Sequence, residues 1–408
     1  MKLLPIPKDK YNEYRLDLMF DCYKWDPQFC DNNTIAEYAL ILTNKEHEEL
    51  KLLTENLIKE TVEAEEFLNK NLSCTKELKL PKKICKEIRS MKNYDPKKHV
   101  RLMRFDFHPT TENKWAVTEV NSDVPGGFAE ATLMNKKALE VLENKNYYII
   151  SFGNILVDAI KSKIRDGAKI MLVHCTSYSD DRQVMQFLGD KLSQLGYEVI
   201  YAAADQVKFE NGKAISLLSG REGEVDAIIR FSPLEWVTEM KSKNWHGYFS
   251  SETLSCNHPI AIFTQTKRFP FVWNLLQSKG IDLSTWKKLL PKTLNVNDKS
   301  VDDEYIFKPV YGRVGEKISI KEACKGDEYE KILKDVKKHP SRYLAQKNFH
   351  SKPIVTEDGE SFHVCIGSYG VENKHAGYYA RISKLPRIDS YAADIPVLIE
   401  RGGAGDDK

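Results

Sequence analysis

Two short segments near residue 100 alternate between apolar and polar residues. They read VRLMRFDFH (residues 100–108) and WAVTEVN (residues 115–121), and six residues, PTTENK, lie between them. Alternation with a period of two is typical of strands that bury one face. We therefore expect a β-hairpin with a long turn, followed by a helix within PGGFAEATLMNKKALEVLEN (residues 125–144).

The stretch from 150 to 235 alternates between helix and strand patterns. FGNILVDAIKSKI and DRQVMQFLGDKLSQLG carry apolar residues at helical spacing, whereas KIMLVHC, YEVIYAA and VDAIIRFSP are short apolar runs. Such runs in alternation with helices are typical of a parallel sheet with crossover helices. We expect a small α/β unit in this part of the chain.

The two ends of the chain follow different patterns. The first 100 residues predict mainly helices, with a capping box at Thr43 and Glu46 and leucines at helical spacing as far as Leu68. After residue 250, YLAQKNF, SFHVCIGSYG and KHAGYYARIS predict strands of one antiparallel sheet. DEYIFKPVYGRVGEKISI predicts two strands around a glycine-containing turn.

These patterns predict a mixed α/β and α+β fold in five parts. The parts are a mainly helical N-terminal region (1–100), a hairpin and helix (101–149), the small α/β unit (150–250), a second core stretch (251–400) and a flexible tail (401–408). The main core is therefore expected to form from two stretches that are far apart in the sequence.

The hairpin brings polar side chains onto one face. Its loop length predicts the cross-strand pairs His108 with Trp115, Asp106 with Val117 and Arg104 with Glu119. Because side chains alternate with a period of two, a slip of two residues in the register leaves the same residues on that face. The face carries Arg104, Asp106, Glu119 and Asn121.

This polar face has the composition of a site for a hard cation. Oxygen ligands without His or Cys suit Mg²⁺, and Asp106, Glu119 and Asn121 supply them. Arg104 beside them would oppose repulsion between the carboxylates and bind a phosphoryl oxygen. The alternative is a solvent-facing hairpin with an ordinary salt bridge between Arg104 and Glu119. Asp123 either ligates the metal or, as we favour, caps the following helix or supports the ligands.

A second polar motif lies in FKPVYGRVGEKISI (residues 307–320). Lys308 stands at the end of an expected strand, and Gly312 and Gly315 stand in the turn. Glycines let backbone amides approach phosphates, and a lysine beside them neutralises phosphate charge. The GK[ST] pattern of a Walker loop is missing, and a plain hairpin turn fits the motif equally well.

Composition limits the class of partner. The 408 residues are 41% hydrophobic and 29% charged, and 61 basic against 59 acidic residues leave a net charge of +2. This balance favours neither a nucleic acid nor a membrane surface, and no apolar run approaches the ~18 residues of a membrane-spanning helix. Eight cysteines without a CxxC pair predict free thiols and a cytoplasmic protein.

Seven motifs together resemble a known family. They occur in the order seen in the glutathionylspermidine synthase family, over about residues 100–400: RFDFH, WAVTEVNSDVPGGFAEA, VDAIIRFSPLEW, FTQTKRFPFVWNLL, FKPVYGRVGE, YLAQKNF and AGYYARIS. The resemblance implies an ATP-grasp ligase with a circularly permuted strand order, in which the small parallel sheet is a preATP-grasp-like unit. It implies the synthetase activity only, since no Cys/His amidase region is visible.

The same resemblance implies roles for ten residues. They are Asp106, Glu119 and Asn121 as metal ligands, Arg104 and Arg381 as catalytic arginines, and Lys267, Lys308, Gly312, Gly315 and Gln346 as nucleotide-binding residues. A solvated Lys267 and a surface Arg381 remain alternatives, and His108 is more typical of a hairpin end than of a ligand. The run at 232–235, Ser-Pro-Leu-Glu, departs from the family's Tyr-Pro-Trp-Glu, which leaves the contacts of that tryptophan unassigned.

The implied activity is that of an ATP-dependent carboxylate–amine ligase, which forms an amide through an acyl-phosphate with ATP and two Mg²⁺ ions. The acid is expected to be a peptide or amino acid, and the amine a polyamine or amino acid. The acidic runs SYSDDRQ and EWVTEMK are candidates to receive the amine, through Asp180, Asp181, Glu235 and Glu239. An ATP-grasp phosphotransferase and a non-catalytic nucleotide-binding protein are the alternatives, and a metal-dependent hydrolase is less favoured without His ligands. The substrates, the oligomeric state and the role of the first 100 residues stay open.

Overall fold

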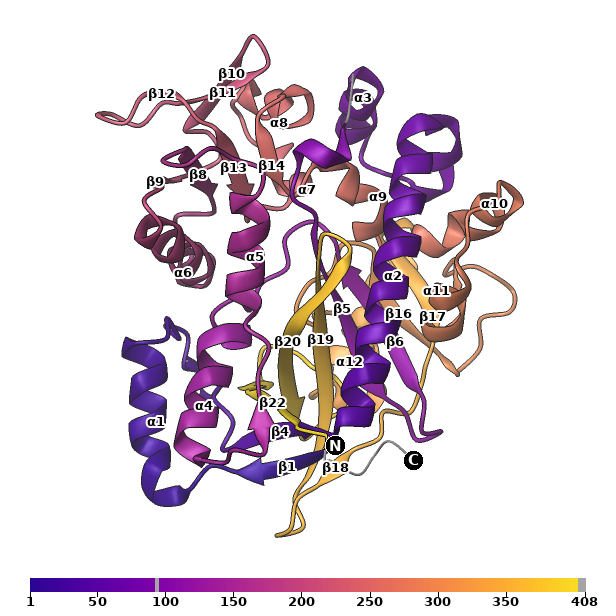
Figure 1. Cartoon of the computed structure of the whole chain (residues 1–408). Helices are drawn as coiled ribbons and strands as arrows, with labels where there is room; N and C mark the ends of the chain where they lie inside the picture. The colour runs from indigo at the N-terminus through magenta and orange to yellow at the C-terminus, as the bar shows by residue number, and fades with distance from the viewer. Residues whose placement is uncertain (92–94, 403–408) are drawn as a thin grey trace.

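A six-stranded antiparallel sheet forms the centre of the protein in a computed structural model, which describes residues 1–91 and 95–402. Its order is β21-β20-β19-β5-β6, with β18 paired to β19. The strands are β5 (Leu102–Pro109), β6 (Trp115–Asn121), β18 (Ile354–Val355), β19 (Ser361–Val371), β20 (Lys374–Ser383) and β21 (Ala393–Ile395). Figure 1 shows β19 and β20 in the middle of the molecule, with α2 (Asn44–Lys70) and α5 (Phe152–Lys161) packed against them. The tail expected at 401–408 lies, from residue 403 on, outside the described residues.

The hairpin of β5 and β6 has a different register from the predicted one. The pairs His108–Trp115, Asp106–Val117 and Arg104–Glu119 are wrong, because the structure pairs Trp115 with Pro109, Val117 with Phe107 and Asn121 with Arg104. Pairing extends one residue further into the turn, and a bulge between Phe105 and Phe107 leaves Thr118 and Glu119 together opposite Asp106. The two shifts add up to two residues, so the shared polar face is retained.

Strand alternation separates the two faces of β5. Its apolar side chains are fully buried in the main hydrophobic core: Met103, Phe105 and Phe107. The core also contains Ile58 of α2 and Trp286 of α11 (Ser284–Leu289). The intervening side chains of β5 line a cavity on the other face of the sheet: Arg104, Asp106 and His108.

The small parallel sheet predicted within residues 150–235 is confirmed. Its order is β14-β13-β8-β9, and every pair of neighbours is parallel. The strands are β8 (Lys169–Val173), β9 (Glu198–Ala202), β13 (Ala227–Arg230) and β14 (Leu254–Cys256), and α6 (Ser179–Gln194) packs on β8 and β9. Tyr178 and Phe231 follow the carboxyl ends of β8 and β13 and line the cavity, at the edge where open α/β sheets bind ligands.

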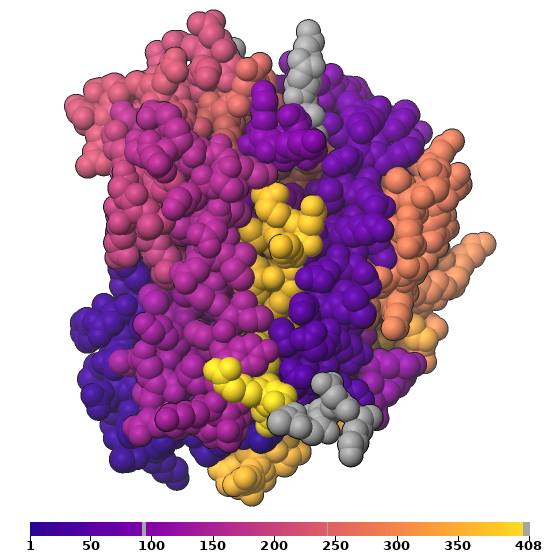
Figure 2. All heavy atoms as spheres, viewed as in Figure 1, coloured from indigo at the N-terminus to yellow at the C-terminus, as the bar shows by residue number. Residues whose placement is uncertain are grey.

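The N-terminal 100 residues combine helices with strands. A four-stranded sheet has the order β1-β4-β22-β7, from β1 (Lys2–Pro5), β4 (Tyr38–Leu42), β22 (Val397–Glu400) and β7 (Tyr147–Tyr148). The first and last strands of the described residues, β1 and β22, therefore share a sheet. α1 (Lys8–Phe20) packs against α4 (Asn135–Leu142), and Figure 2 shows the N-terminal segment beside the segment around residue 140. The predicted capping box of Thr43 and Glu46 begins α2.

Two strand predictions in the C-terminal half are wrong. The segment 343–347 does not join β19 and β20 but lies in a separate sheet of order β15-β17-β16, from β15 (Thr293–Leu294), β16 (Tyr305–Pro309) and β17 (Tyr343–Lys347). The second strand predicted after the glycine turn is a loop, since residues 311–320 are all described and contain no strand. Positive φ angles at Val314, Gly315 and Lys317 interrupt the extended backbone there.

Shorter elements connect these sheets. The helices are α3 (Lys82–Ser90), α7 (Leu234–Val237), α8 (Gly247–Ser250), α9 (Ile262–Gln265), α10 (Trp273–Ser278) and α12 (Glu328–Lys338), and the strands are β2 (Gln28–Phe29), β3 (Asn32–Asn33), β10 (Val207–Glu210), β11 (Lys213–Ser216) and β12 (Gly223–Glu224). None of the helices in the described ranges is long and apolar enough to cross a membrane.

Candidate active site

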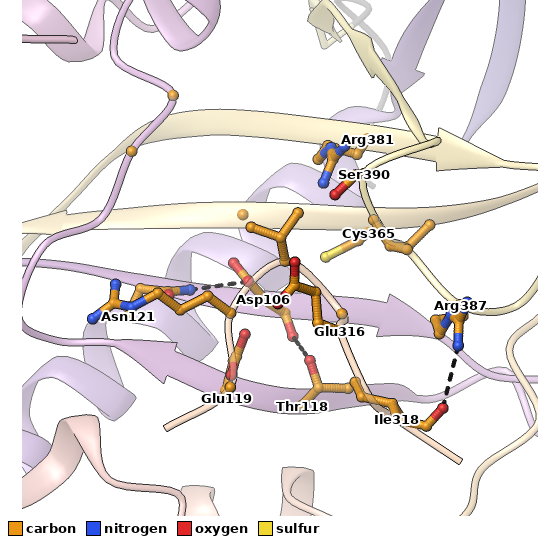
Figure 3. Close-up of a pocket in the computed structure, with 18 of the residues that line it drawn as sticks. Asp106, Thr118, Glu119, Asn121, Glu316, Ile318, Cys365, Arg381, Arg387 and Ser390 are labelled. Carbon is orange, nitrogen blue, oxygen red and sulfur yellow. Dashed lines mark hydrogen bonds between the residues drawn. The ribbon is translucent and has the colours of Figure 1, made fainter. Parts of the chain in front are cut away.

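A cavity of about 1100 Å³ lies between the central sheet, the β15–β17 sheet and the loops around residues 25–34, 312–318 and 386–390. Nine of the ten residues with roles implied by the sequence line this cavity: Arg104, Asp106, Glu119, Asn121, Lys267, Lys308, Gly312, Gly315 and Arg381. The tenth, Gln346, stands behind Lys308. Figure 3 shows side chains from β5, β6, β19 and β20 directed into this space.

The central sheet leaves room for Arg104. Gly367 of β19 pairs with Asp106, and a Cβ at residue 367 would lie 2.6 Å from Cδ of Arg104. That distance is too short for any larger residue to leave Arg104 where it is. The guanidinium of Arg104 also lies 5.0 Å from the ring centroid of Tyr379, within the range of a cation–π contact.

Arg104 and Asp106 form a bidentate pair. Nε and Nη2 of Arg104 donate to Oδ1 and Oδ2 of Asp106 at 2.8 and 3.1 Å, and Nη1 donates to the backbone oxygen of Gly126 at 3.0 Å. The amide of Asn121 donates to Oδ2 of Asp106 at 3.0 Å. This geometry fixes the carboxylate in one orientation at the floor of the cavity.

Glu119 lies beside two lysines. Nζ of Lys267 contacts Oε2 of Glu119 at 2.6 Å and donates to the backbone oxygen of Gly312 at 2.7 Å. Burial opposes ionisation of Glu119, but the charges of Lys267 and then Lys308 lower its pKa below the usual value. Lys267 therefore connects the hairpin to the glycine loop, and it is not the solvated lysine that the sequence left as an alternative.

Lys308 is buried, and its pKa lies below the usual value for a lysine. Its Nζ donates to Oε1 of Gln346 at 2.9 Å, and its residue is 4% exposed. The pKa of Lys308 is lowered to about 8, mainly by burial and also by the charge of Lys267, while Glu119 acts in the opposite direction. Nearby, burial lowers the pKa of His108 to about 3, so its imidazole is neutral and does not add to the positive charge.

Arg381 approaches the cavity from β20. Its Nη2 donates to the backbone oxygen of Ala392 at 3.0 Å, and its Nε lies 3.4 Å from Oδ1 of Asp394. The side chain retains 17% of its exposure. Arg381 is thus a partly enclosed arginine that faces the cavity rather than a surface arginine, and Figure 3 shows it near Cys365.

The donor set fits magnesium in its chemistry. Asp106, Glu119 and Asn121 offer two carboxylates and an amide oxygen, which is what Mg²⁺ uses when waters and phosphates complete its shell. In the described parts of the chain, no three His, Cys, Asp or Glu side chains converge as a closed metal site. Each carboxylate is instead paired with a cationic side chain, Asp106 with Arg104 and Glu119 with Lys267. These side chains neutralise the two carboxylate charges.

Asp123 takes a structural position. It is fully buried, and its carboxylate is paired with Arg230 of β13 and accepts a hydrogen bond from the backbone N–H of Leu234 at 2.9 Å. It therefore meets the N-terminus of α7 and not the helix that follows Pro125. The contacts of its carboxylate come from β13 and the start of α7, while its backbone N–H donates to Oε1 of Gln265 and its backbone oxygen accepts from Nδ2 of Asn257, both at 2.8 Å.

The glycine loop is held at the cavity mouth by its neighbours. Nη2 of Arg313 donates to Oε1 of Glu235 at 2.8 Å, and its guanidinium lies 5.3 Å from the ring centroid of Trp236. Nη1 of Arg387 donates to the backbone oxygen of Ile318 at 3.4 Å (Figure 3). Trp236 thus stands two positions after Leu234, where the resemblance implies a tryptophan, and it contacts the loop.

The acidic residues considered for amine binding lie in three different environments. Asp180 and Asp181 line the cavity, and burial raises the pKa of Asp181 to about 6. Glu235 is paired with Arg313. Glu239 contacts Lys83 at 3.2 Å, remains 71% exposed and does not line the cavity.

One cluster at the acidic end of the cavity has no signal in the sequence. It consists of Lys24, Asp26, Glu130 and Asp394, which come from the loop after α1, the helical turn at 130–134 and β21. The residues have no characteristic spacing and surround no motif. Only the folded chain brings them together.

The comparisons with known proteins identify the family. The family model described as "Glutathionylspermidine synthase preATP-grasp" matches residues 13–400, and the chain belongs to this family. No curated protein sequence matches the chain. A solved structure from Methylobacillus flagellatus KT, described as "Putative gamma-glutamylcysteine synthetase", shares 14% identity and a TM-score of 0.42, over 85% of this chain and 87% of that chain. This likeness is too low to support an argument about function.

Family membership defines the class of protein. The predicted fold class is confirmed: a mixed α/β and α+β chain of the ATP-grasp ligase type that includes a preATP-grasp unit with a small parallel sheet. The chain is accordingly a synthetase of the glutathionylspermidine synthase type, an ATP-dependent ligase that acts on small molecules. The family match alone does not identify its substrates.

Proposed function

We propose that the protein is an ATP-dependent carboxylate–amine ligase that forms an amide through an acyl-phosphate. One observation carries the proposal: a single cavity contains oxygen ligands for a hard cation, two lysines and four arginines, among them Arg104 and Arg381. Phosphoryl transfer depends mainly on positioning and on charge neutralisation, and it needs no protein nucleophile. A set of cations around carboxylates suits that chemistry.

The residues divide by position in the cavity. Lys267 and Lys308 stand beside the glycine loop and would hold the nucleotide phosphates, with the loop at Gly312 over them. Arg104 and Arg381 approach from the central sheet and would hold the transferred phosphoryl group and the acid's carboxylate. Bound Mg²⁺, two ions in this proposal, would supply further charge neutralisation at the phosphates.

The chemical balance has two steps. A carboxylate oxygen of the acid attacks the γ-phosphorus of ATP, so that ADP leaves and an acyl-phosphate forms. The neutral nitrogen of the amine then attacks the acyl carbon, inorganic phosphate leaves and the nitrogen loses a proton. The acid is proposed to be a peptide or amino acid, and the amine a polyamine or amino acid received by Asp180 and Asp181.

The experiment measures release of ADP and phosphate from MgATP with pooled acids, in the presence and absence of pooled amines that include spermidine. Dependence on both pools, with a product lighter by one water than the two substrates combined, is the expected result. Glu119→Gln should remove most of the release, and Glu239→Gln, outside the cavity, should leave it unchanged. Release with acids alone and a stable phosphorylated product would replace the ligase with a phosphotransferase. MgATP binding without release would indicate a non-catalytic nucleotide-binding protein.

A further inference from the structure

A buried lysine holds three carboxylates at the acidic end of the cavity. Nζ of Lys24 contacts Oδ1 of Asp26 at 2.6 Å, Oδ2 of Asp394 at 2.6 Å and Oε1 of Glu130 at 3.4 Å. The side chain of Lys24 is 2% exposed. Burial acts to lower the pKa of Lys24, but Asp394, Glu130 and Asp26 raise it above its usual value, so the ammonium stays charged.

The lysine and its partners face the cavity differently. Asp26, Glu130 and Asp394 line the cavity, whereas Lys24 contacts them from behind the wall. Each carboxylate therefore has one oxygen bound to the lysine while its residue borders the space that a ligand would enter. The protein itself supplies an ammonium where a cationic ligand would otherwise be held.

One oxygen of this cluster has no partner. Glu130 is 6% exposed, and its Oε1 also accepts a hydrogen bond from Nε2 of Gln183 at 3.2 Å. Its Oε2 is buried and accepts no hydrogen bond from any described residue. A buried carboxylate oxygen without a donor costs free energy, so a donor that enters from the cavity would be bound favourably.

The local charges leave a deficit of one cation. Asp26, Glu130 and Asp394 carry three negative charges when ionised, against one on Lys24 and one on Arg381, which lies 3.4 Å from Asp394. Asp180 also acts on Asp26, but it is exposed, so solvent screens its charge and it is not counted with this group. One further positive charge would balance the group. Two would exceed it, and surplus buried charge without a partner is strongly unfavourable.

We propose that Lys24 is a specificity-determining residue for the amine substrate: its ammonium permanently occupies one of two cation positions in the acidic end of the cavity. The remaining position takes a single ammonium group, so the acceptor carries one positive charge there rather than two. The substrate class is a monoamine or an amino acid that presents one amino group, in preference to a diamine or polyamine. This inference rests on the proposed ligase function, because that function supplies the need for an amine.

Equilibrium binding of two small amines tests the inference without turnover. The probes are n-pentylamine and 1,4-diaminobutane, which have equal numbers of non-hydrogen atoms but one and two ammonium groups. Calorimetry at pH 8 is suitable, since burial raises the pKa of Glu130 to about 7 and the carboxylate is then ionised. The proteins are the wild type, Lys24→Met, Lys24→Arg and Lys137→Met, the last removing a lysine that pairs with Asp17 outside the cavity.

The expected result is a change of preference in one variant only. Wild type, Lys24→Arg and Lys137→Met should bind n-pentylamine at least as tightly as the diamine. Lys24→Met should bind the diamine at least about tenfold more tightly than wild type does, because pairing a buried charge commonly changes an equilibrium by a factor of ten or more. An unchanged ratio in Lys24→Met, or a preference of the wild type for the diamine, would overturn the inference.

A second measurement covers the case in which Lys24→Met does not fold alone. The variant is then refolded by dilution into each amine, and recovery with the diamine but not with n-pentylamine is the expected result. Equal recovery with both amines, or with neither, counts against the inference. Failure of the ligase proposal is seen separately, as the absence of amide formation with any acid and amine.

Discussion

The buried pair of Asp123 and Arg230 tests whether Asp123 stabilises the fold, as its contacts indicate, rather than binding the metal ion. Asp123 is 0% exposed and Arg230 is 4% exposed. Oδ2 of Asp123 accepts hydrogen bonds from Nη1 of Arg230 at 3.1 Å and from the backbone N–H of Leu234 at 2.9 Å, and Oδ1 accepts from Nη2. Asp123→Asn removes the charge and turns an amide N–H₂ toward a guanidinium that only donates.

The magnitude follows from burial. Removal of one partner from a buried ion pair costs about 3–5 kcal/mol, because the other charge is left uncompensated. Unfolding releases about 2.1 cal/mol/K of entropy per residue, so a chain of 408 residues that unfolds as one unit would lose roughly 5 °C in melting temperature for a loss of about 4 kcal/mol. Smaller cooperative units would lose more.

Thermal melting and the magnesium dependence of ADP release form the assay. Asp123→Asn should lower the melting temperature and leave the Mg²⁺ concentration for half-maximal rate unchanged. The matched variant Asp106→Asn should raise the Mg²⁺ concentration for half-maximal rate, since Asp106 lines the cavity among the oxygen ligands. Its melting temperature should fall as well, because Asp106 pairs with the largely buried Arg104, so the Mg²⁺ dependence separates the two variants. A melting temperature at the wild-type value in Asp123→Asn, together with weaker use of Mg²⁺, would show that the structural assignment is wrong.

Three further predictions concern the cavity. Glu119→Gln should lower the rate of ADP release by about 10²–10³, as expected for loss of one electrostatic element, and a wild-type rate would remove Glu119 from the site. The free protein's Lys308 has a pKa of about 8, and bound phosphate would raise it, so above about pH 8 binding of MgATP takes up a proton and weakens with rising pH. Titration calorimetry should show this in the wild type and a flatter profile in Lys308→Arg, and equal slopes would contradict it. Gly367→Ala places a Cβ 2.6 Å from Cδ of Arg104 and should lower the ligase rate by roughly a hundredfold, with circular dichroism unchanged and a rate near wild type as the contrary outcome.

Strand alternation explains how much of the site was predictable. The period of two in β5 and β6 places Arg104, Asp106, Glu119 and Asn121 on one face under any even shift of register. The register itself was not predictable, because a bulge adds a residue to one strand and leaves no mark on the length of the loop. The parallel sheet was predictable for a similar reason, since buried strands and crossover helices have distinct patterns.

Long-range pairing limits what the sequence can show. Asp123 pairs with Arg230, which lies 107 positions later in the sequence, and nothing in the sequence around either residue indicates this pairing. Lys24 and Asp394 come from opposite ends of the chain. The assignment of residues 343–347 to a separate sheet also depends on partners distant in sequence, because short strands of similar composition fit either sheet.

The strand order of the central sheet has a consequence for synthesis of the chain. β5 pairs with β6 at once, but its other edge waits for β19, which follows residues 110–360. At about 5–20 residues per second, a ribosome needs roughly 10–50 s to make that intervening stretch. During that interval the nascent hairpin carries an open edge, and open edges promote pairing with other chains. The strands of the parallel sheet are all encoded before residue 257, but their core also contains Tyr369, Val371 and Ala376 of β19 and β20, so neither this core nor the cavity is complete until the ribosome has nearly finished.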